Sequence, residues 1–370
     1  MRILLLNTVC ASGSVGKICA NQARGYARQG HTVKIAYGRE GFVPEDIRPF
    51  AHRIGTDRDG KLHGLRTRLT DTHGFGSARA TRKFLAWAEH YDPQLLWLHN
   101  LHGYYIHIGL LMDWIKSRPQ MEVRWTLHDC WAFTGHCAYF DYAGCDGWKT
   151  GCRRCVQKGE YPASRLLSNS AGNYRRKKEL FTGLPKLTLV TPSKWLAELV
   201  KESFLGCYPV EVVPNTIDME LFRPTAGDFR LRHGLENRIL VLGVANNWER
   251  RKGLEDFIKL AELLDDRYRI VLVGLRPEQI RKLPQGILGI TRTESPQALA
   301  QLYTTADVFV NPTYEDNYPT VNLEAAACGT PVITYRTGGS VESVPPEQVV
   351  EKGDVPGLKA MIEKLTGEGK

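Results

Sequence analysis

The stretch that decides the fold runs from Pro312 to Thr334 and reads PTYEDNYPTVNLEAAACGTPVIT. The apolar residues before it, 306–311, predict a buried strand. Pro319 is tolerated in the first turn of a helix, because the N–H that proline lacks would be unpaired there. Gly329 predicts the left-handed end of this helix, and Val332 to Tyr335 predicts the next strand. The stretch is therefore one strand–loop–helix–strand unit.

The start of this helix predicts a site for an anion. Its unpaired N–H groups and positive dipole end suit phosphate or pyrophosphate when the helix begins beyond the carboxyl end of a strand. Asp316 and Glu324 lie eight residues apart around this start, where carboxylates would accept hydrogen bonds from sugar or ribose hydroxyls. The structural alternative is that Asp316 caps the helix and Glu324 lies on a solvated face.

Strand and helix patterns alternate along the chain, which predicts an α/β protein with parallel sheets and crossover helices. The expected strands are 1–6, 32–37, 95–99, 123–128 and 187–191, then 239–244, 269–273, 307–310 and 331–335. Helices are expected at 254–264 and 296–305. The run FRPTAG at 222–227 has the character of a linker, so we place the domain boundary there, give or take ten residues. The expected domains are 1–222 and 223–370.

Composition agrees with two ordinary domains. The chain has 370 residues, of which 42% are hydrophobic and 24% charged, enough for two full cores. It lacks a run of 18 apolar residues, and its start, MRILLLN, has one positive charge and no small-residue cleavage site. We therefore expect a cytoplasmic protein.

The net charge of +9 favours an acidic partner, which leaves nucleotide diphosphate, anionic lipid and nucleic acid open. The densest basic run, Arg175 to Lys178 (RRKK), lies in a segment that predicts a helix and carries no interleaved aromatics for base stacking. One interpretation is a solvated helix face. The other is peripheral contact with the cytoplasmic leaflet, worth roughly 1 kcal/mol per basic residue, which would suit a lipid-linked acceptor.

Four further runs carry a family resemblance. They are LWLHNLHGYYI (96–106), TLHDCWAFTGHC (126–137), TPSKWLAE (191–198) and VVPNTID (212–218). With the acid-x7-acid spacing of Asp316 and Glu324, the chain resembles the retaining glycosyltransferases of family 4 over nearly its whole length. The resemblance is closest to members of the colanic-acid type, which build bacterial exopolysaccharide and capsule. It implies the GT-B fold, in which two Rossmann-like domains face each other across a cleft.

The resemblance implies a retaining, metal-independent hexosyltransferase that needs no cofactor for catalysis. The donor would be a UDP- or GDP-linked sugar, the acceptor a glycan or a lipid-linked sugar, and nucleic acid is not expected as a partner. The implied catalytic residues are His128, Lys252 and Asp316. The implied donor-binding residues are Gly13, Gly16, Asn247, Arg250, Arg251, Lys252, Glu315, Asp316, Asn317, Tyr318, Thr320 and Glu324.

The second domain departs from the family pattern at two places. The family usually has an arginine, a gap of four, then lysine and glycine; Lys252 and Gly253 match, but Asn247 stands at the arginine position. Arg250 or Arg251 would then supply the missing cation. An arginine binds a diphosphate with a planar, forked guanidinium, whereas a lysine acts as a point charge, so the two residue types are not equivalent. Asp316 is one methylene shorter than the usual glutamate. Glu315 precedes it, and either acid could reach the sugar, although the spacing to Glu324 favours Asp316.

In the first domain, Gly13 and Gly16 occupy the loop after the first strand and precede the expected helix. The resemblance places this loop near the donor pyrophosphate and the acceptor, and a purely structural tight turn is the alternative. His128 follows a strand and is implied to contact the transferred sugar; a hydrogen-bonded structural histidine is the alternative. His99, Asn100 and His102 are expected to shape the acceptor pocket.

The cysteines form a second unusual pattern. Four of the nine, Cys137, Cys145, Cys152 and Cys155, lie in a loop-like insert at about 130–160. Four thiolates with one C-x2-C pair could hold a structural zinc ion and order the insert. Disulfides, which a cytosolic compartment disfavours, and free thiols are the alternatives, because the spacing is not that of a standard zinc ribbon.

Two other functions remain compatible with the sequence. A nucleotide-sugar 2-epimerase shares the fold and the pyrophosphate site but needs no acceptor. A zinc-containing nucleic-acid-binding protein would account for the charge and the cysteines, although it leaves the ordered donor motifs unexplained.

Overall fold

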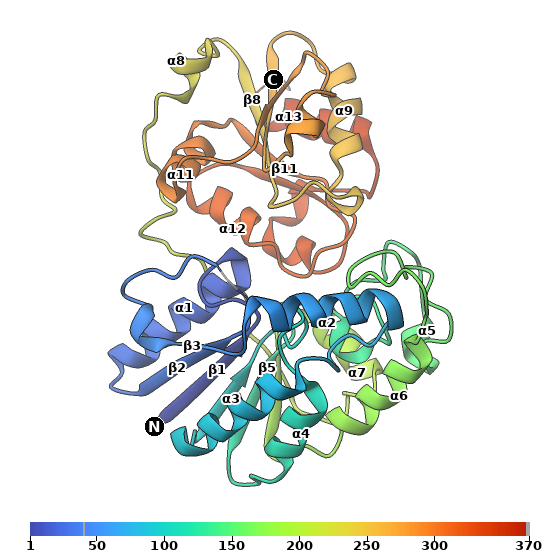
Figure 1. Cartoon of the computed structure of the whole chain (residues 1–370). Coiled ribbons are helices and arrows are strands. Elements are labelled where there is room, and N and C mark those ends of the chain that lie inside the picture. Colours follow the sequence, from blue (N-terminus) through green and yellow to red (C-terminus); the bar gives the residue numbers. More distant parts are fainter. Residues whose placement is uncertain (40, 368–370) are drawn as a thin grey trace. The chain divides into compact units, whose positions relative to one another are not determined.

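The computed structural model describes residues 1–39 and 41–367. The chain folds into two compact units, Met1–Pro214 and Asn215–Lys370. They are the blue-to-green and the yellow-to-red parts of Figure 1. The division precedes the boundary predicted between 222 and 223, because Phe222 is buried in the core of the second unit, with its ring centroid 6.2 Å from that of Tyr303.

The first unit contains a seven-stranded sheet in the order β3-β2-β1-β4-β5-β6-β7, and every ladder is parallel. Its strands are β1 (Arg2–Asn7), β2 (Thr32–Tyr37), β3 (Ala51–Arg53), β4 (Leu95–Leu98), β5 (Glu122–Thr126), β6 (Leu187–Thr191) and β7 (Val210–Val212). Its helices are α1 (Gly13–Arg28), α2 (Asp57–Thr70), α3 (Ala78–Tyr91), α4 (Ile108–Lys116), α5 (Gly147–Thr150), α6 (Ser170–Phe181) and α7 (Lys194–Glu202), with 3-10 turns η1 (Arg48–Phe50) and η2 (Trp131–Phe133).

The second unit contains a six-stranded sheet in the order β10-β9-β8-β11-β12-β13, again with parallel ladders. Its strands are β8 (Ile239–Val244), β9 (Tyr268–Val273), β10 (Ile287–Ile290), β11 (Val308–Asn311), β12 (Val332–Tyr335) and β13 (Val349–Val350). Its helices are α8 (Phe229–His233), α9 (Leu254–Leu263), α10 (Pro277–Ile280), α11 (Pro296–Thr305), α12 (Thr320–Ala327) and α13 (Val355–Leu365), with η3 (Arg250–Lys252), η4 (Ser340–Ser343) and η5 (Pro346–Gln348).

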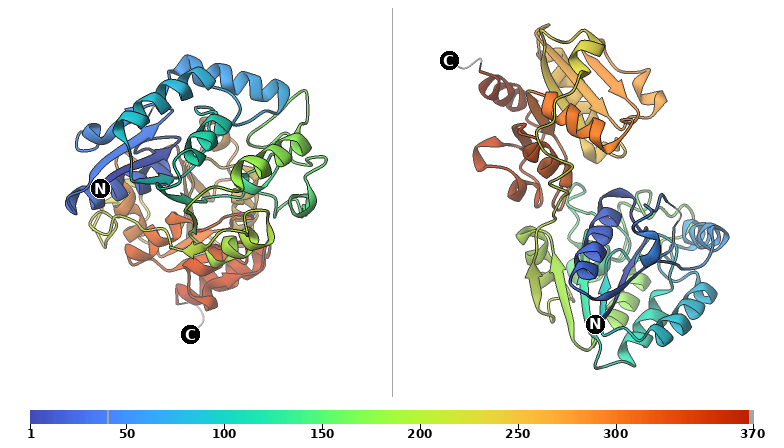
Figure 2. Two further views of the ribbon diagram at one scale, coloured as in Figure 1. Left: turned by 90° about the horizontal axis from the view of Figure 1, so that it is seen from below. Right: turned by 90° about the vertical axis from the view of Figure 1, so that its left-hand side faces the viewer.

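Both sheets have helices on their two faces (Figure 2). In β1, Ile3 and Leu5 pack on one face with α1, whereas Leu4 and Leu6 pack on the other with α3 and α4. A strand buried on both faces reads as a continuous apolar run, which is why RILLLN carries no alternation. The predicted α/β class with two Rossmann-like sheets is therefore confirmed.

The strands that the sequence analysis did not predict, β3, β7, β10 and β13, all lie at the edges of their sheets. They have between two and four residues each, and most of their positions are partly exposed. Edge strands need less apolar sequence than central ones, since one side of the strand pairs with no neighbour. Their sequence pattern is correspondingly weak.

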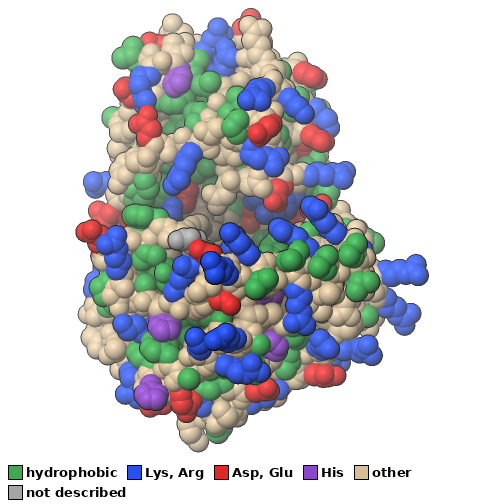
Figure 3. All heavy atoms as spheres, viewed as in Figure 1, with side chains coloured by type: hydrophobic (Ala, Val, Ile, Leu, Met, Phe, Trp, Pro, Cys, Tyr) green, Lys and Arg blue, Asp and Glu red, His purple; other side chains and the backbone are tan. Residues whose placement is uncertain are grey.

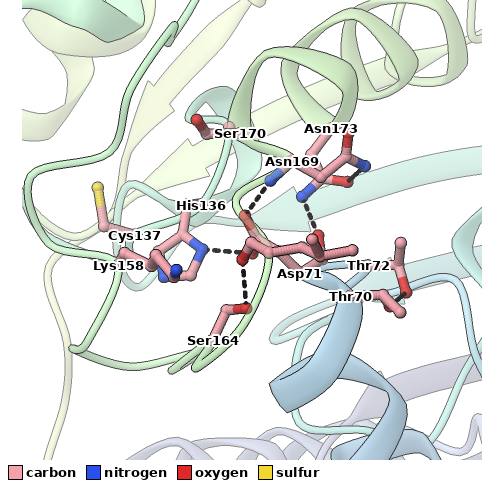
Figure 4. A network of polar contacts seen from close by, with 12 residues as sticks. Thr70, Asp71, Thr72, His136, Cys137, Lys158, Ser164, Asn169, Ser170 and Asn173 are labelled. Atoms are coloured by element: carbon pink, nitrogen blue, oxygen red, sulfur yellow. Dashed lines mark hydrogen bonds and ion pairs between the residues drawn. The ribbon is translucent and has the colours of Figure 1, made fainter.

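The insert at about 130–160 is anchored by a buried polar network around Asp71, shown in Figure 4. One carboxylate oxygen of Asp71 lies 2.5 Å from Nδ1 of His136, and the other accepts a hydrogen bond from the backbone N–H of Asn169 at 2.7 Å. Asn173 donates to the backbone carbonyl of Asp71. These contacts tie the end of α2 to the insert and to the start of α6.

The basic run in α6 is not uniformly solvated. Arg175, Arg176 and Lys178 are exposed, but Lys177 is only 1% exposed. Its ammonium lies 3.5 Å from the ring centroid of Trp131 and donates to the backbone carbonyls of Trp131 (2.7 Å) and Thr134 (3.1 Å). Burial lowers the pKa of Lys177 to about 7. The solvated-face interpretation is therefore wrong for Lys177, which instead supports the start of the insert.

No helix within residues 1–39 and 41–367 combines the length and the apolar composition that crossing a bilayer requires.

Candidate functional site

In each unit the strand order reverses between two neighbouring central strands. The reversal falls between β1 and β4 in the first unit and between β8 and β11 in the second. Ligands of doubly wound sheets bind beyond the carboxyl ends of the strands at such a switch point. Ligand-binding and catalytic residues are therefore expected in the loops that follow these four strands.

The loops after β8 and β11 are held against each other by the backbone. The N–H of Tyr314 donates to the carbonyl of Arg251 at 2.7 Å, and the hydroxyl of Thr313 donates to the same carbonyl at 3.2 Å. Gly253 has φ +74°, and a Cβ at this position would lie 2.2 Å from the carbonyl oxygen of Pro312. Only glycine permits this approach.

Lys252 and Asp316 form an ion pair across these loops. Nζ of Lys252 lies 2.5 Å from Oδ2 of Asp316, and the two side chains are 18% and 13% exposed. Burial lowers the pKa of Lys252, and the neighbouring Asp316 carboxylate opposes that shift. The cation is thus positioned with one carboxylate partner, at a place where a phosphate oxygen would be an alternative partner.

Asp316 does not cap α12, so that interpretation is wrong. Pro319 is the residue that precedes the helix, whereas the second carboxylate oxygen of Asp316 accepts from the backbone N–H of Asn317 at 2.9 Å. Thr320, rather than Pro319, is the first helical residue. Glu315 is buried, and its backbone carbonyl accepts from Arg251 at 3.1 Å. Asp316 is therefore the acid that contacts the cation of the neighbouring loop, Lys252.

Glu324 lies on a buried face of α12, so the solvated-face interpretation is wrong here as well. The residue is 8% exposed, and its Oε2 accepts a hydrogen bond from the hydroxyl of Tyr303 at 3.2 Å. Burial, together with the carboxylate beside it, raises the pKa of Tyr303 well above its ordinary value, so this phenol stays protonated and donates. Its hydrogen bond orients the carboxylate.

The remaining residues of the two loops differ in their exposure. Asn247 and Arg250 are exposed, and the amide of Asn247 donates to Glu249 at 3.1 Å. Arg251 is the arginine that reaches the loop after β11, through the carbonyl of Glu315. Asn317 is buried, and the carbonyl of Tyr318 accepts from Asn215 at 2.9 Å.

The first unit brings His99 and His128 together at the carboxyl ends of β4 and β5. Nδ1 of His99 lies 3.0 Å from Nε2 of His128, and Nε2 of His99 lies 2.9 Å from the side-chain oxygen of Gln22. Burial lowers the pKa of His128 to about 4 and that of His99 well below its ordinary value. Both rings are therefore neutral near pH 7, so one donates to the other and the pair carries no charge.

A second polar cluster surrounds His102. Its Nε2 lies 2.8 Å from a carboxylate oxygen of Asp129, and its Nδ1 lies 2.9 Å from the hydroxyl of Tyr161. Burial tends to raise the pKa of Asp129, but the contact with His102 outweighs burial and leaves that pKa lowered. The backbone carbonyl of Asn100 accepts from Thr8 at 3.2 Å and from Tyr105 at 2.8 Å. The residues predicted to shape the acceptor pocket, His99, Asn100 and His102, thus all lie just beyond the carboxyl end of β4.

Gly13 and Gly16 lie inside α1 rather than before it, because the helix begins at Gly13. Gly13 has φ +65°, and a Cβ at Gly16 would lie 3.0 Å from the backbone carbon of Ala11. These glycines therefore let the loop after β1 turn closely into the helix.

The sequence profile described as "Glycosyl transferases group 1" matches residues 236–368, which include Lys252, Asp316, Glu324 and the loops that carry them. This part of the chain is similar to the group 1 glycosyltransferases. The resemblance to family 4 enzymes of the GT-B fold is thereby confirmed.

Among the relatives of this chain is WcaC of Escherichia coli (strain K12), described as a colanic acid biosynthesis glycosyl transferase. The two are 26% identical over 259 residues, which cover 68% of this chain and 62% of WcaC. A D-inositol 3-phosphate glycosyltransferase of Corynebacterium jeikeium (strain K411) is 29% identical over 175 residues, 41% of this chain and 42% of the relative. The matched part is thus less than two thirds of the length of these relatives.

Solved structures confirm the fold. Anabaena Alr3699/HepE in complex with UDP and glucose superposes with a TM-score of 0.68 at 16% identity, covering 100% of this chain and 90% of the other. WaaG, a glycosyltransferase involved in lipopolysaccharide biosynthesis, superposes with a TM-score of 0.66 at 14% identity, covering 98% and 92%.

The nine cysteines form no disulfide within the part of the chain that the structure describes. The Cys137 and Cys155 thiols are in hydrogen-bond contact, which lowers the pKa of Cys155 to about 6, and Sγ of Cys152 accepts from the N–H of Gly135 at 3.2 Å. Throughout the described part of the chain, no group of three or more His, Cys, Asp or Glu side chains is placed to hold a metal ion. The zinc centre predicted from Cys137, Cys145, Cys152 and Cys155 therefore does not fit this geometry. The insert is ordered instead by the Asp71 network and by Lys177.

Several residues of the candidate site were not predicted. Tyr303 orients Glu324, and Gln22 and Tyr161 contact the histidines of the first unit. Asp129 follows His128 directly, so the position of that histidine could have pointed to it. The others come from elements far away in the sequence, and no local pattern indicates them.

Proposed function

We propose that this protein is a group 1 glycosyltransferase that moves a sugar from a nucleoside-diphosphate sugar, UDP- or GDP-linked, to an acceptor with retention of anomeric configuration. The observation that carries the proposal is the convergence of Lys252, Asp316 and the start of α12 at the switch point of the second sheet. A point cation and unpaired helix N–H groups suit a diphosphate. HepE, which shares the fold, has been solved with UDP and glucose.

In this proposal the second unit binds the donor and the first binds the acceptor. Lys252 and the N–H groups at Thr320 stabilise charge on the departing diphosphate, a preorganised electrostatic effect that lowers barriers by several kcal/mol. Asp316 accepts from the sugar hydroxyls and Glu324 from the ribose hydroxyls. Arg251 is the preferred second cation, since it already contacts the loop after β11.

The bond changes follow from these roles. The bond between the anomeric carbon and the diphosphate breaks, and an acceptor oxygen bonds to that carbon on the same face. The proton of the acceptor hydroxyl passes to the departing diphosphate. His128, neutral because burial lowers its pKa to about 4, serves as a hydrogen-bonding group for the transferred sugar rather than as a charged acid. No protein carboxylate needs to form a covalent intermediate.

We further propose that the acceptor is a glycan or lipid-linked sugar of bacterial surface polysaccharide synthesis. The similarity to WcaC supports this pathway. The enzyme would then work in the cytoplasm, peripherally at the inner membrane, where lipid-linked acceptors lie.

Thermal unfolding with UDP, GDP, ADP and their sugars tests the donor site. A ligand at 100 times its dissociation constant adds about 2.7 kcal/mol to the free energy of unfolding. We expect one nucleotide to raise the melting temperature of the wild type but not that of Glu324→Ala. If none of the nucleotides raised the melting temperature of the wild type, the result would contradict the proposal. Release of a free epimerised sugar without acceptor would instead support the 2-epimerase alternative.

A further inference from the structure

The outer face of α2 is apolar although it is exposed. Leu62, Leu65 and Leu69 follow the spacing of one helical face, and each is between 41% and 67% exposed. The inner face of the same helix carries buried polar or small residues, His63 and Thr67 among them. A surface helix normally turns its apolar side inward. Here the leucines point away from the core.

A second exposed apolar segment lies beside the end of α2. Leu166 and Leu167 are 67% and 59% exposed. The N–H of Arg165 donates to the carbonyl of Arg68 at 2.7 Å, and the N–H of Leu167 donates to the carbonyl of Leu69 at 3.2 Å. These hydrogen bonds place the two segments side by side. We call α2 together with residues 165–167 the leucine surface.

Basic residues surround these leucines. The exposed ones on the two segments are Arg58, Lys61, Arg66, Arg68 and Arg165. The acidic residues of α2 lie only in its first turn, where Asp57 pairs with Arg53 and Asp59 bonds to Thr56 as part of the helix cap. Figure 3 shows hydrophobic side chains interspersed with Lys and Arg on this face of the first unit. The leucine surface is therefore both apolar and net positive.

We propose that the leucine surface docks on a lipid bilayer that carries anionic headgroups. Leucines of an interfacial helix enter the boundary of the acyl chains while flanking Lys and Arg side chains contact the headgroups. An apolar protein groove would contact the leucines but not the five exposed cations, so charge complementarity favours the bilayer. The inference concerns the lipid-linked acceptor of the proposed function, but it does not depend on the donor site.

The leucine surface also replaces the basic run as the expected membrane contact. Arg175, Arg176 and Lys178 are exposed, but Lys177 is buried and no exposed large hydrophobic residue lies within this helix. Such a run offers charge without insertion, and charge alone binds membranes weakly at physiological salt.

Flotation of the full chain with lipid vesicles tests the inference. We expect binding to vesicles of phosphatidylethanolamine with phosphatidylglycerol, weaker binding at high salt, and little binding to phosphatidylcholine alone. The double variant Leu62→Gln/Leu65→Gln should lose at least about tenfold in partitioning, as removal of two inserted apolar side chains predicts. Lys61→Glu/Arg66→Glu should lose as much.

Matched controls distinguish binding through the leucine surface from non-specific vesicle binding. Leu231→Gln removes an exposed leucine of the second unit, 71% exposed, and Arg175→Glu/Lys178→Glu reverses charge on α6. Both should bind vesicles as the wild type does. Equal binding by Leu62→Gln/Leu65→Gln and the wild type, or binding to no vesicle, would overturn the proposal. UDP or GDP binding in the same variants shows separately whether the donor site is present.

Discussion

Lys252 and Asp316, 64 residues apart in the chain, meet at 2.5 Å where the loops after β8 and β11 touch. Each largely buried charge is balanced by the other, and removal of one partner from such a pair leaves an uncompensated charge. A donor diphosphate would offer Lys252 a second anion and leave Asp316 available to sugar hydroxyls. In the proposed function, the pair would therefore link phosphate binding to sugar binding.

Substitutions in this pair should have opposite effects on nucleotide binding. We expect Lys252→Ala to weaken UDP or GDP binding and to lower turnover by 100-fold or more, about 3 kcal/mol, because it removes the cation at the leaving group. Asp316→Asn should bind the free nucleoside diphosphate at least as tightly as the wild type, since a competing anion is lost, but should transfer sugar more than tenfold more slowly. Calorimetry and initial rates measure both. Weaker nucleotide binding by Asp316→Asn would contradict the competition argument.

The contact between Tyr303 and Glu324 predicts that substitutions of these two residues weaken nucleotide binding to different degrees. Glu324→Gln removes a charge-assisted acceptor for the ribose, so nucleotide affinity should fall by about 10- to 100-fold, or roughly 1.5–3 kcal/mol. Tyr303→Phe removes only the hydrogen bond that orients the carboxylate, worth about 1 kcal/mol, so affinity should fall about fivefold. An effect of Tyr303→Phe as large as that of Glu324→Gln would show that the tyrosine has a direct role.

Gly253 should be irreplaceable for steric reasons. Gly253→Ala introduces a Cβ 2.2 Å from the carbonyl oxygen of Pro312 at φ +74°, so we expect it to lower the free energy of unfolding by about 3 kcal/mol and to abolish nucleotide binding. Gly234→Ala is the matched control, because φ is +61° there but nothing lies within 4 Å of the added Cβ. It should lose only about 1 kcal/mol. Equal losses would contradict the proposed clash.

Buried neutral histidines should make the protein acid-sensitive. Burial lowers the pKa values of His63 and His128 to about 4, whereas an unfolded histidine titrates near 6.5. Between these values the unfolded chain binds protons that the folded chain does not. The free energy of unfolding should therefore fall as the pH drops from about 6.5 to about 4, by up to about 1.4 kcal/mol per pH unit for each histidine.

Thermal unfolding at several pH values between about 4 and 8 measures this slope. His63→Gln should reduce the slope below pH 6.5, even if its stability at neutral pH is lower, since it removes one of the groups that take up a proton on unfolding. The same slope in His63→Gln and the wild type would exclude His63 as a contributor.

Much of the scaffold followed from sequence periodicity. Central strands such as β2, β6 and β8 have the predicted bounds, and the helix at 296–305 matches α11. Buried parallel strands are continuous apolar runs, which a single sequence displays plainly. Edge strands were missed because short, half-exposed segments lack such a run.

The sequence by itself determined the fold class, the family resemblance and the residue types proposed to bind a nucleotide sugar, because turn glycines, prolines and acid spacing are local features. Only the tertiary structure decided which of these residues meet. Lys252 pairs with Asp316, Tyr303 orients Glu324, and His99 contacts His128 through folding that joins distant segments. The cysteine spacing predicted a zinc centre that the geometry does not fit. Spacing along a chain limits which side chains can converge, whereas packing determines where they point.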